Sequence, residues 1–425
     1  MKKGIAVLLT LVCLFTILLS SCEKRRKPTD TLWIVTNVGF PDEEFGGEDD
    51  LRHIIEYLGG LPSGIDIELE VLPLEGAELH TRLTSLRTEL LSGGGPDVFL
   101  MYAPPLPDRE LLFQIPEIAM DRYFMPLDEL KDNAKFMDWD AMNSKILATG
   151  HSDKGQMLLP MFYGYNVAGT DEPVDNIPGS WDEALEISDK AAREGYGAAI
   201  QRGRFRDVAL TEVADYENES MAITEEELNR RVKEALSFTY DEENAIAWAM
   251  TELAGEEEST ELGIHGEAET IIPLYNTEGG LTAKINSYIA VNQNTTHKED
   301  ALTLVDMMMN RDFLTLEGFW SERRTMDKSA MFLFNNLRAW NGGNPIYDDF
   351  FDDGRSIMYA FTLSEERRAL QKELAEKISF VYIPTVIDQE LIKLFKECMT
   401  AGSDEEIDKL VSKCYTTMNM MLAES

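Results

Sequence analysis

Ser92-Gly93-Gly94-Gly95-Pro96 is the segment whose composition comes closest to a catalytic loop. Consecutive glycines can aim backbone N–H groups at a phosphate or an oxyanion. However, a phosphate-binding loop continues into Lys-Ser or Lys-Thr, and a hydrolase nucleophile lies in a Gly-x-Ser-x-Gly turn. The segment fits neither pattern, and it follows a leucine-rich helical pattern. We therefore interpret it as the stop of a helix.

The acidic and histidine residues form no recognisable catalytic or metal-binding pattern. With 77 Asp and Glu residues in the chain, neighbouring carboxylates are expected by chance, so spacing cannot identify a glycosidase pair. Asp348–Gly354 is only vaguely like a calcium loop, because it lacks alternating ligands and a distal Glu. The five histidines are scattered without a His-Glu-x-x-His motif. The sequence predicts no catalytic residue, no metal site and no cofactor, and hence not an enzyme.

The four cysteines divide into two near the N-terminus, Cys13 and Cys22, and two near the C-terminus, Cys398 and Cys414. No CxxC or zinc-type spacing is present. The C-terminal two flank a Gly402-Ser403 turn between two helical patterns. Two alternatives follow, a disulfide between the helices or two half-buried thiols.

Residues 1–22 have the layout of a secretory signal. Met1-Lys2-Lys3 precedes an apolar run, Gly4–Leu19, which leads into Ser20-Ser21-Cys22. A cysteine at this place resembles the lipobox of bacterial lipoproteins, in which the new N-terminal Cys is acylated with fatty acids such as palmitate. We predict a signal peptide over 1–21 and, over 22–30, a lipid anchor on Cys22 with its tether. The chain would then lie on the extracellular face of the cell membrane.

An uncleaved membrane helix is the alternative for this segment. Residues 4–19 fall short of the roughly 20 residues that span a bilayer. The basic stretch Lys24–Lys27 nevertheless favours a helix that keeps the rest of the chain in the cytosol.

Length and charge limit the classes of function. Removing residues 1–21 from the 425-residue chain leaves 404, which suggests two or three domains. Hydrophobic residues make up 44% of the chain, enough for a sizeable core. The net charge of −38 repels nucleic acid and favours a soluble monomer.

Strand and helix patterns alternate after residue 30. Predicted strands cover Thr31–Thr36, Ile65–Leu72 and Asp97–Tyr102, and predicted helices cover Leu51–Leu58 and Ala77–Leu91. The second helix has five leucines that we expect on one side: Leu79, Leu83, Leu86, Leu90 and Leu91. Such alternation predicts a parallel α/β sheet whose ligands lie beyond the carboxyl ends of the strands. Residues 37–40 and 102–105 are therefore candidates for a cleft.

Several short motifs follow one another in a characteristic order. They are Gly95-Pro96-Asp97, Pro126-Leu127-Asp128-Glu129, Gly155–Pro160 and Ser180-Trp181-Asp182-Glu183, and later Gly279–Asn292 followed by His297–Ala301. Over about residues 31–310 this order resembles the extracellular solute-binding proteins of bacterial ABC importers, family 1, sugar-binding type.

The resemblance implies an α/β fold of two lobes (type II), each a central sheet flanked by helices, with the ligand cleft between them. Lobe 1 would contain 31–137 plus 286–345, and lobe 2 would contain 138–285 plus 346–425. It also implies a function, delivery of a sugar or oligosaccharide to ABC transporter permease subunits by hinge closure. One region departs from the family. Residues 203–272 are strongly acidic, and Ala247–Met250 lacks the family's Gly and Phe. The ligand wall of lobe 2 is therefore expected to be unusual.

Carbohydrate binding needs aromatic faces for the sugar ring and polar groups for its hydroxyls. Eight residues of these types lie at predicted loops or hairpins: Asn37, Phe40, Tyr102, Phe162, Tyr163, Tyr165, Tyr275 and Trp320. Phe162-Tyr163-Gly164-Tyr165 is the most suggestive run, with the alternative that its residues simply pack the sheet. Trp33 and Trp181 are expected to be packing residues.

Two other functions remain open. A sensor or adhesion module on the same fold would close on a ligand but lack a permease. A surface glycan hydrolase would need a carboxylate pair in the cleft.

Overall fold

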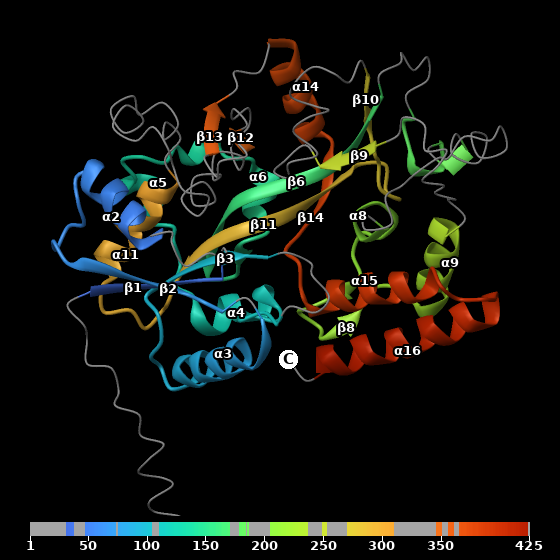
Figure 1. The fold of residues 1–425 in the computed structure, drawn as a ribbon, viewed down its shortest axis with the longest axis horizontal. Helices are drawn as coiled ribbons and strands as arrows, with labels where there is room; N and C mark the ends of the chain where they lie inside the picture. The colour runs from blue at the N-terminus through green and yellow to red at the C-terminus, as the bar shows by residue number, and fades with distance from the viewer. Residues whose placement is uncertain are drawn as a thin grey trace, which may run out of the picture.

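Eight strands form one mixed sheet at the centre of the protein (Figure 1). The computed structural model describes residues 31–37, 47–73, 75–103, 110–170, 178–183, 185–186, 205–236, 249–252, 270–309, 346–350, 356–360 and 365–423. The strands are β1 (Thr31–Thr36), β2 (Asp66–Val71), β3 (Val98–Tyr102), β6 (Leu158–Thr170), β9 (Ala249–Glu252), β10 (Thr270–Pro273), β11 (Leu281–Val291) and β14 (Ile378–Tyr382). Six follow the order β10-β6-β11-β3-β1-β2, while β14 pairs with β11 and β9 pairs with β6.

The remaining described elements are short ribbons and helices. The ribbons are β4 (His151–Ser152) with β5 (Gly155–Gln156), β7 (Ala214–Asp215) with β8 (Ser220–Met221), and β12 (Ile346–Phe350) with β13 (Ser356–Ala360). The helices are α2 (Gly47–Tyr57), α3 (Gly76–Leu91), α4 (Pro116–Tyr123), α5 (Leu130–Asn133), the 3-10 helix η1 (Trp139–Ala141), α6 (Ser144–Ala148), α8 (Phe205–Ala209), α9 (Glu225–Leu236), α11 (Lys298–Met308), α14 (Glu365–Glu376), α15 (Val386–Cys398) and α16 (Asp404–Ala423). Among the described helices, none combines the length and apolar character needed to cross a bilayer.

The first strands and helices confirm the predicted alternation. β1 pairs in parallel with β2 on one side and with β3 on the other. The side chains of β1 alternate between the faces, since Leu32 and Ile34 pack beneath α2 and α11 while Trp33 and Val35 pack against α3 and α4. Trp33 is therefore a core residue, as the sequence predicts.

The leucine face of α3 is narrower than the sequence predicts. Leu79, Leu83, Leu86 and Leu90 are buried, whereas Leu91 is 75% exposed. The prediction for Leu91 is wrong because successive helical residues are about 100° apart, so Leu91 cannot share the face of Leu90. Gly93, with φ +79°, follows the helix, and its N–H donates to Leu90 O. The glycine segment is thus a helix stop, as predicted.

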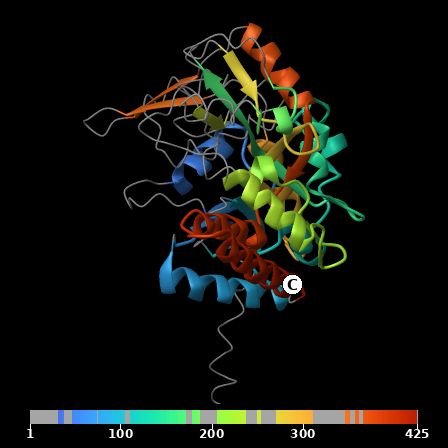
Figure 2. The same ribbon diagram turned by 90° about the vertical axis from the view of Figure 1, so that its right-hand side faces the viewer.

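The described residues form three hydrophobic cores, and we name them by the helices in them. The α2/α11 core and the α3/α4 core lie on opposite faces of β1 and β3. The helical core joins α8, α9, α15 and α16. Figure 2 shows α9 beside the red helices α15 and α16. Trp181 is buried in this core, which confirms its predicted packing role.

The two C-terminal cysteines are free thiols on α15 and α16. Both are buried in the helical core, and burial raises the pKa of Cys398 to about 11 and that of Cys414 to about 12. Of the two alternatives, the structure has the thiols rather than the disulfide.

Buried aspartates of α11 connect segments that are far apart in the sequence. Asp306 accepts hydrogen bonds from three backbone N–H groups, those of Lys135, Phe136 and Met137, at 2.7, 3.1 and 2.8 Å. Asp300 accepts from the N–H and the hydroxyl of Ser63 at 2.9 and 2.8 Å. These carboxylates orient the loops that cover the α2/α11 core.

Replacing Asp306 with alanine should therefore lower the free energy of unfolding by about 3 kcal/mol, because three backbone N–H groups lose a charged acceptor. Urea denaturation followed by circular dichroism measures the change. The control is Glu405→Ala, whose side chain is 80% exposed and pairs with Lys409; it should change stability by less than about 0.5 kcal/mol. Equal effects of the two substitutions would contradict the role of Asp306.

Candidate functional site

The carboxyl ends of β1 and β3 are joined by one side chain. Asn37 follows β1 and is buried. Its Nδ2 donates to the carbonyl oxygen of Tyr102 at 2.6 Å, and the N–H of Tyr102 donates to its Oδ1 at 2.7 Å. The structure thus brings together Asn37 and Tyr102, two of the predicted ligand-binding residues, at the edge where α/β sheets bind ligands.

Beside this edge runs β11, a strand that is buried along its whole length but carries polar side chains. Thr282, Lys284, Asn286 and Ser287 are each less than 10% exposed. The carbonyl of Asn286 accepts a hydrogen bond from the N–H of Ala103 at 2.8 Å, directly after β3. Polar side chains placed beside the carboxyl ends of β1 and β3 are suited to contact a ligand there, so this stretch is a candidate wall of the site.

A buried ion pair lies next to β11, at the start of α15. Nε of Arg206 on α8 donates to Asp388 at 2.5 Å, and the two side chains are 6% and 2% exposed. Arg206 Nη1 also donates to the carbonyls of Leu210 and Thr211 at 2.8 and 2.9 Å. Asp388 in turn accepts from the N–H and the hydroxyl of Thr385, which caps α15. The charges of the pair are therefore satisfied inside the protein.

The guanidinium of Arg206 also lies over the ring of Tyr382 on β14, 4.3 Å from its centroid. The Tyr382 hydroxyl donates to Asp207, the neighbour of Arg206 on α8. Burial raises the pKa of Tyr382 well above its usual value, and the negative charge of Asp207 adds to the shift. Tyr382 therefore stays a neutral hydrogen-bond donor, and this network fixes α8 against the sheet.

The predicted aromatic residues that the structure describes lie mostly in the α3/α4 core. Tyr163 and Tyr165 are alternate residues of β6, with ring centroids 6.4 Å apart, and both are buried. Tyr275 is buried in the same core, with Lys377 Nζ 5.9 Å from its ring centroid. These three tyrosines pack against the sheet. For Tyr163 and Tyr165 this is the alternative that the sequence analysis left open. Contact of the tyrosines with a ligand stays a prediction.

The other predicted residues are only partly described. The backbone of Phe162 pairs with Ser287 on β11, but its side chain lies outside the description. Phe40, Trp320 and the predicted lipidation site Cys22 lie outside the described residues. Sequence reasoning missed Lys284, Asn286 and Arg206; the first two were detectable as polar residues inside the predicted return crossing.

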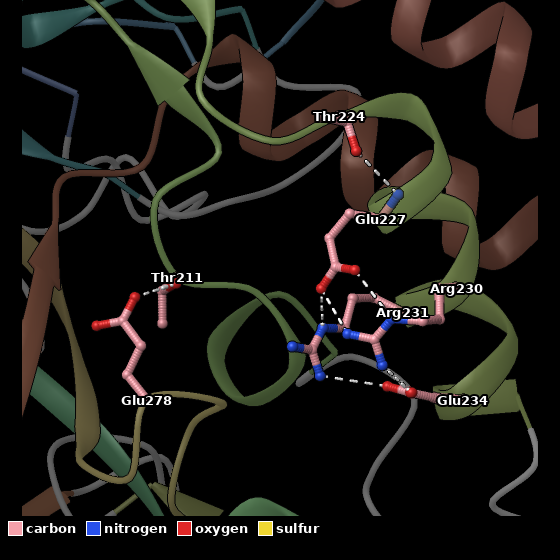
Figure 3. Close-up of polar contacts among 7 residues, drawn as sticks. All are labelled: Thr211, Thr224, Glu227, Arg230, Arg231, Glu234 and Glu278. Carbon is pink, nitrogen blue, oxygen red and sulfur yellow. Dashed lines mark hydrogen bonds and ion pairs between the residues drawn. The ribbon is translucent and has the colours of Figure 1, made fainter.

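A second candidate is a cavity of about 210 Å³ beside α9. Its lining residues come from the helix that starts at Trp181, from α9 and from the turn before β11: Ser180, Trp181, Asp182, Arg230, Arg231, Asn276, Thr277 and Gly279. Figure 3 shows that Glu227 and Glu234 form ion pairs with both Arg230 and Arg231. Arg230 donates to Glu227 at 2.6 and 2.9 Å, and Arg231 donates to Glu227 at 2.8 Å and to Glu234 at 3.3 Å.

These pairings balance the charge of the cavity wall. The hydrogen bond from Arg230 lowers the pKa of Glu227, and Glu227 raises the pKa of Arg230. Glu278, which lies in the chain between the lining residues Thr277 and Gly279, accepts a hydrogen bond from the Thr211 hydroxyl at 2.7 Å (Figure 3). An anionic ligand would have to compete with two glutamates, so the wall suits a neutral polar molecule better than an anion. Within the described ranges no group of three His, Cys, Asp or Glu residues is placed to hold a metal ion.

Comparison with known proteins identifies the fold. No family model and no curated protein sequence matches the chain. Among solved structures, an extracellular solute-binding protein family 1 from Alicyclobacillus acidocaldarius is 13% identical with a TM-score of 0.52, over 93% of this chain and 99% of that one. A periplasmic oligogalacturonide-binding protein from Yersinia enterocolitica is 12% identical with a TM-score of 0.56, over 93% and 99% of the two chains.

The chain has the type II solute-binding-protein fold. The chain is also similar in structure to the sugar-binding protein MalE from Xanthomonas citri, with 12% identity and a TM-score of 0.55 over 93% of this chain and 98% of that one. The predicted fold class is confirmed, and the similarity extends over nearly the full length of both chains.

Replacing Arg206 with methionine should lower the free energy of unfolding by about 3–5 kcal/mol, because Asp388 would remain as a buried charge without its cation. Chemical denaturation measures the loss. Arg230→Met is the matched control. Its ion pairs lie at the surface, with the Arg230 side chain 48% exposed, and their loss should cost less than about 1 kcal/mol. A change below about 1 kcal/mol at Arg206 would show that the buried pair does not stabilise the α8–α15 contact.

Proposed function

We propose that this chain is an extracellular solute-binding protein that encloses a carbohydrate between two lobes and presents it to ABC transporter permease subunits. The lobes comprise 31–137 plus 286–345 and 138–285 plus 346–425. No bond of the solute is made or broken. The ligand stabilises the closed state because it contacts both lobes at once.

The observation that supports this function best is the pair of long strands β6 and β11. They run antiparallel from Ala283–Tyr165 to Ala290–Leu158 and extend between the β1–β3 region and the α8–α9 region (Figure 1). The register of β11 shifts on either side of Ser287, in the middle of this pairing. An irregularity in the strands between two lobes is a natural place for a hinge.

The carbohydrate assignment rests on the similar structures and on the chemistry of the strand ends. The similar proteins are described as binding sugars or oligogalacturonide. Amides such as Asn37 and Asn286 can both donate to and accept from sugar hydroxyls. Phe40, Phe162 and Trp320 are the proposed stacking residues.

Thermal melting of residues 23–425 against mono- and oligosaccharides, with amino acids, peptides and polyamines as controls, tests the function. A true ligand at 100-fold excess over its Kd should stabilise the protein by about 2.7 kcal/mol, which corresponds to several degrees in Tm. A shift with a control compound alone would keep the fold and overturn the carbohydrate assignment. No shift with any compound would favour a sensor or adhesion module.

The variant Asn286→Ala links the binding to the strand-end site. It removes the side-chain amide but keeps the backbone carbonyl that accepts from Ala103 N–H, so the saccharide Kd should rise at least tenfold. Asn294→Ala is the control, because this exposed residue follows the opposite end of β11. Calorimetric titration gives both Kd values, and an equal Kd in the two variants would place the ligand elsewhere.

The proposed localisation is the extracellular face of the cell membrane, through acylation of Cys22. Cys22→Ser should remove the lipid acceptor and release the protein from the membrane fraction. Labelling with a fatty acid analogue and fractionation measure the change. Ser21→Ala, which keeps a small residue before the cysteine, is the control. A Cys22→Ser protein that stays with the membrane would contradict the anchor.

A further inference from the structure

The α3/α4 core and the helical core meet along a line of polar groups, which we call the seam: Glu117, Arg206, Tyr216, Thr385 and Asp388. Two segments cross it. Ala119 on α4 packs in the α3/α4 core, while Ile115, the residue just before α4, packs in the helical core. Likewise, Ile383, just before α15, packs in the α3/α4 core, while Ile387, within α15, packs in the helical core.

Backbone hydrogen bonding joins the two segments at the seam. The N–H of Val386 at the start of α15 donates to the carbonyl of Gln114, just before α4, at 3.1 Å. The N-termini of α4 and α15 are therefore in direct contact, and their first turns present acidic side chains, Glu117 and Asp388, to the same region.

Glu117 is the seam residue whose hydrogen bonding is incomplete. Its Oε2 is shielded from solvent and has no hydrogen-bond partner among the described residues. In contrast, Asp388 accepts hydrogen bonds from Arg206 Nε and from the N–H and the hydroxyl of Thr385. A buried carboxylate oxygen without a donor is costly when charged, and much less so when the group carries a proton.

Among the described residues, the groups around Glu117 offer it no cation of its own. Asp388 faces it from α15, Tyr216 from the segment after β7, and Tyr288 from β11. Arg206 on α8 is committed to Asp388. Burial and, less strongly, the charge of Asp388 raise the pKa of Glu117 to about 8, against the opposing effect of its own backbone N–H.

We propose that Glu117 is a proton-binding site that controls the contact between α4 and α15. With its proton, Glu117 stays in the seam as a neutral acid. Without it, the carboxylate draws water into the seam and loosens the two helix starts. The protein therefore holds its two cores together tightly near neutral pH and less tightly in mildly alkaline solution. This inference does not depend on the ligand or on the transport function.

The direction of the effect follows from proton linkage. The pKa of Glu117 is about 8 in the folded protein and 4.5 when unperturbed. Between these values the folded state binds more protons than the unfolded state, so stability falls as pH rises. The contribution of Glu117 is complete below pH 4.5 and is lost once pH exceeds 8.

Glu117→Gln tests the proposal on the purified protein, because glutamine keeps the shape but cannot ionise. The Tm difference, variant minus wild type, should increase by several degrees from pH 5 to pH 9. Hydrogen exchange of the α4 and α15 amides, corrected for intrinsic chemical exchange, should become at least tenfold faster in the wild type above pH 8 and stay unchanged in the variant. Identical pH profiles would overturn the proposal.

Glu227→Gln is the matched control. Glu227 is paired with Arg230 and Arg231, and its pKa is lowered, so it is fully charged across this pH range. Its substitution should give a constant Tm offset. If Glu117→Gln fails to fold, Glu117→Met supplies a second non-ionising side chain suited to the seam. Titration of the Glu117 carboxyl by carbon NMR should give a midpoint near 8, and a midpoint near 4.5 would exclude the site.

Discussion

The fold depends on keeping every backbone group of β11 hydrogen-bonded inside the protein. All eleven residues of the strand are buried, so water cannot replace a lost partner. β14 pairs with its first part, β3 with its last part, and β6 along most of its length. Any relative movement of the two halves must therefore bend β6 and β11 together rather than separate them. The register shifts around Ser287 are where such bending disturbs the fewest regular bonds.

The polar side chains beside β11 also affect how the neighbouring helices are oriented. Buried ion pairs contribute little net stability compared with apolar packing, but removing one partner of such a pair destabilises the folded protein strongly. The Arg206–Asp388 pair, together with Tyr382 and Asp207, therefore specifies one orientation of α8 and α15 more than it strengthens the core. A binding site needs this kind of fixed support, since a ligand contact loses value when its wall can rearrange.

The sequence predicted the parts of the fold that local patterns determine. Strands near Thr31, Ile67 and Val98, the helix over Ala77–Leu91 and its glycine stop follow from periodicity and turn chemistry. Family-like motifs supplied the two-lobe arrangement. The candidate binding site was harder to predict from the sequence. Alternation on β6 shows that Tyr163 and Tyr165 share a face, but not that this face is a core.

Partners far apart in the chain were beyond any local pattern. Arg206 and Asp388 are 182 positions apart, and nothing near either residue indicates the other. Glu117 reads as an ordinary acidic residue in the first turn of a helix, where negative charge is favourable. Its burial follows from tertiary packing against α15, β11 and the segment after β7, and these contacts reverse the local expectation for its charge.

A polar seam between two apolar cores lets the contact between α4 and α15 change at a lower cost than an apolar contact would. Separating two apolar surfaces costs about 25 cal/mol for each Å² exposed, and nothing recovers that cost in water. Hydrogen-bonding groups such as Thr385 and Tyr216 exchange protein partners for water at a much smaller net cost. The α3/α4 core and the helical core can each remain intact while the contact between them opens. The fold thus combines a strand pair that resists separation with a neighbouring polar contact that tolerates separation.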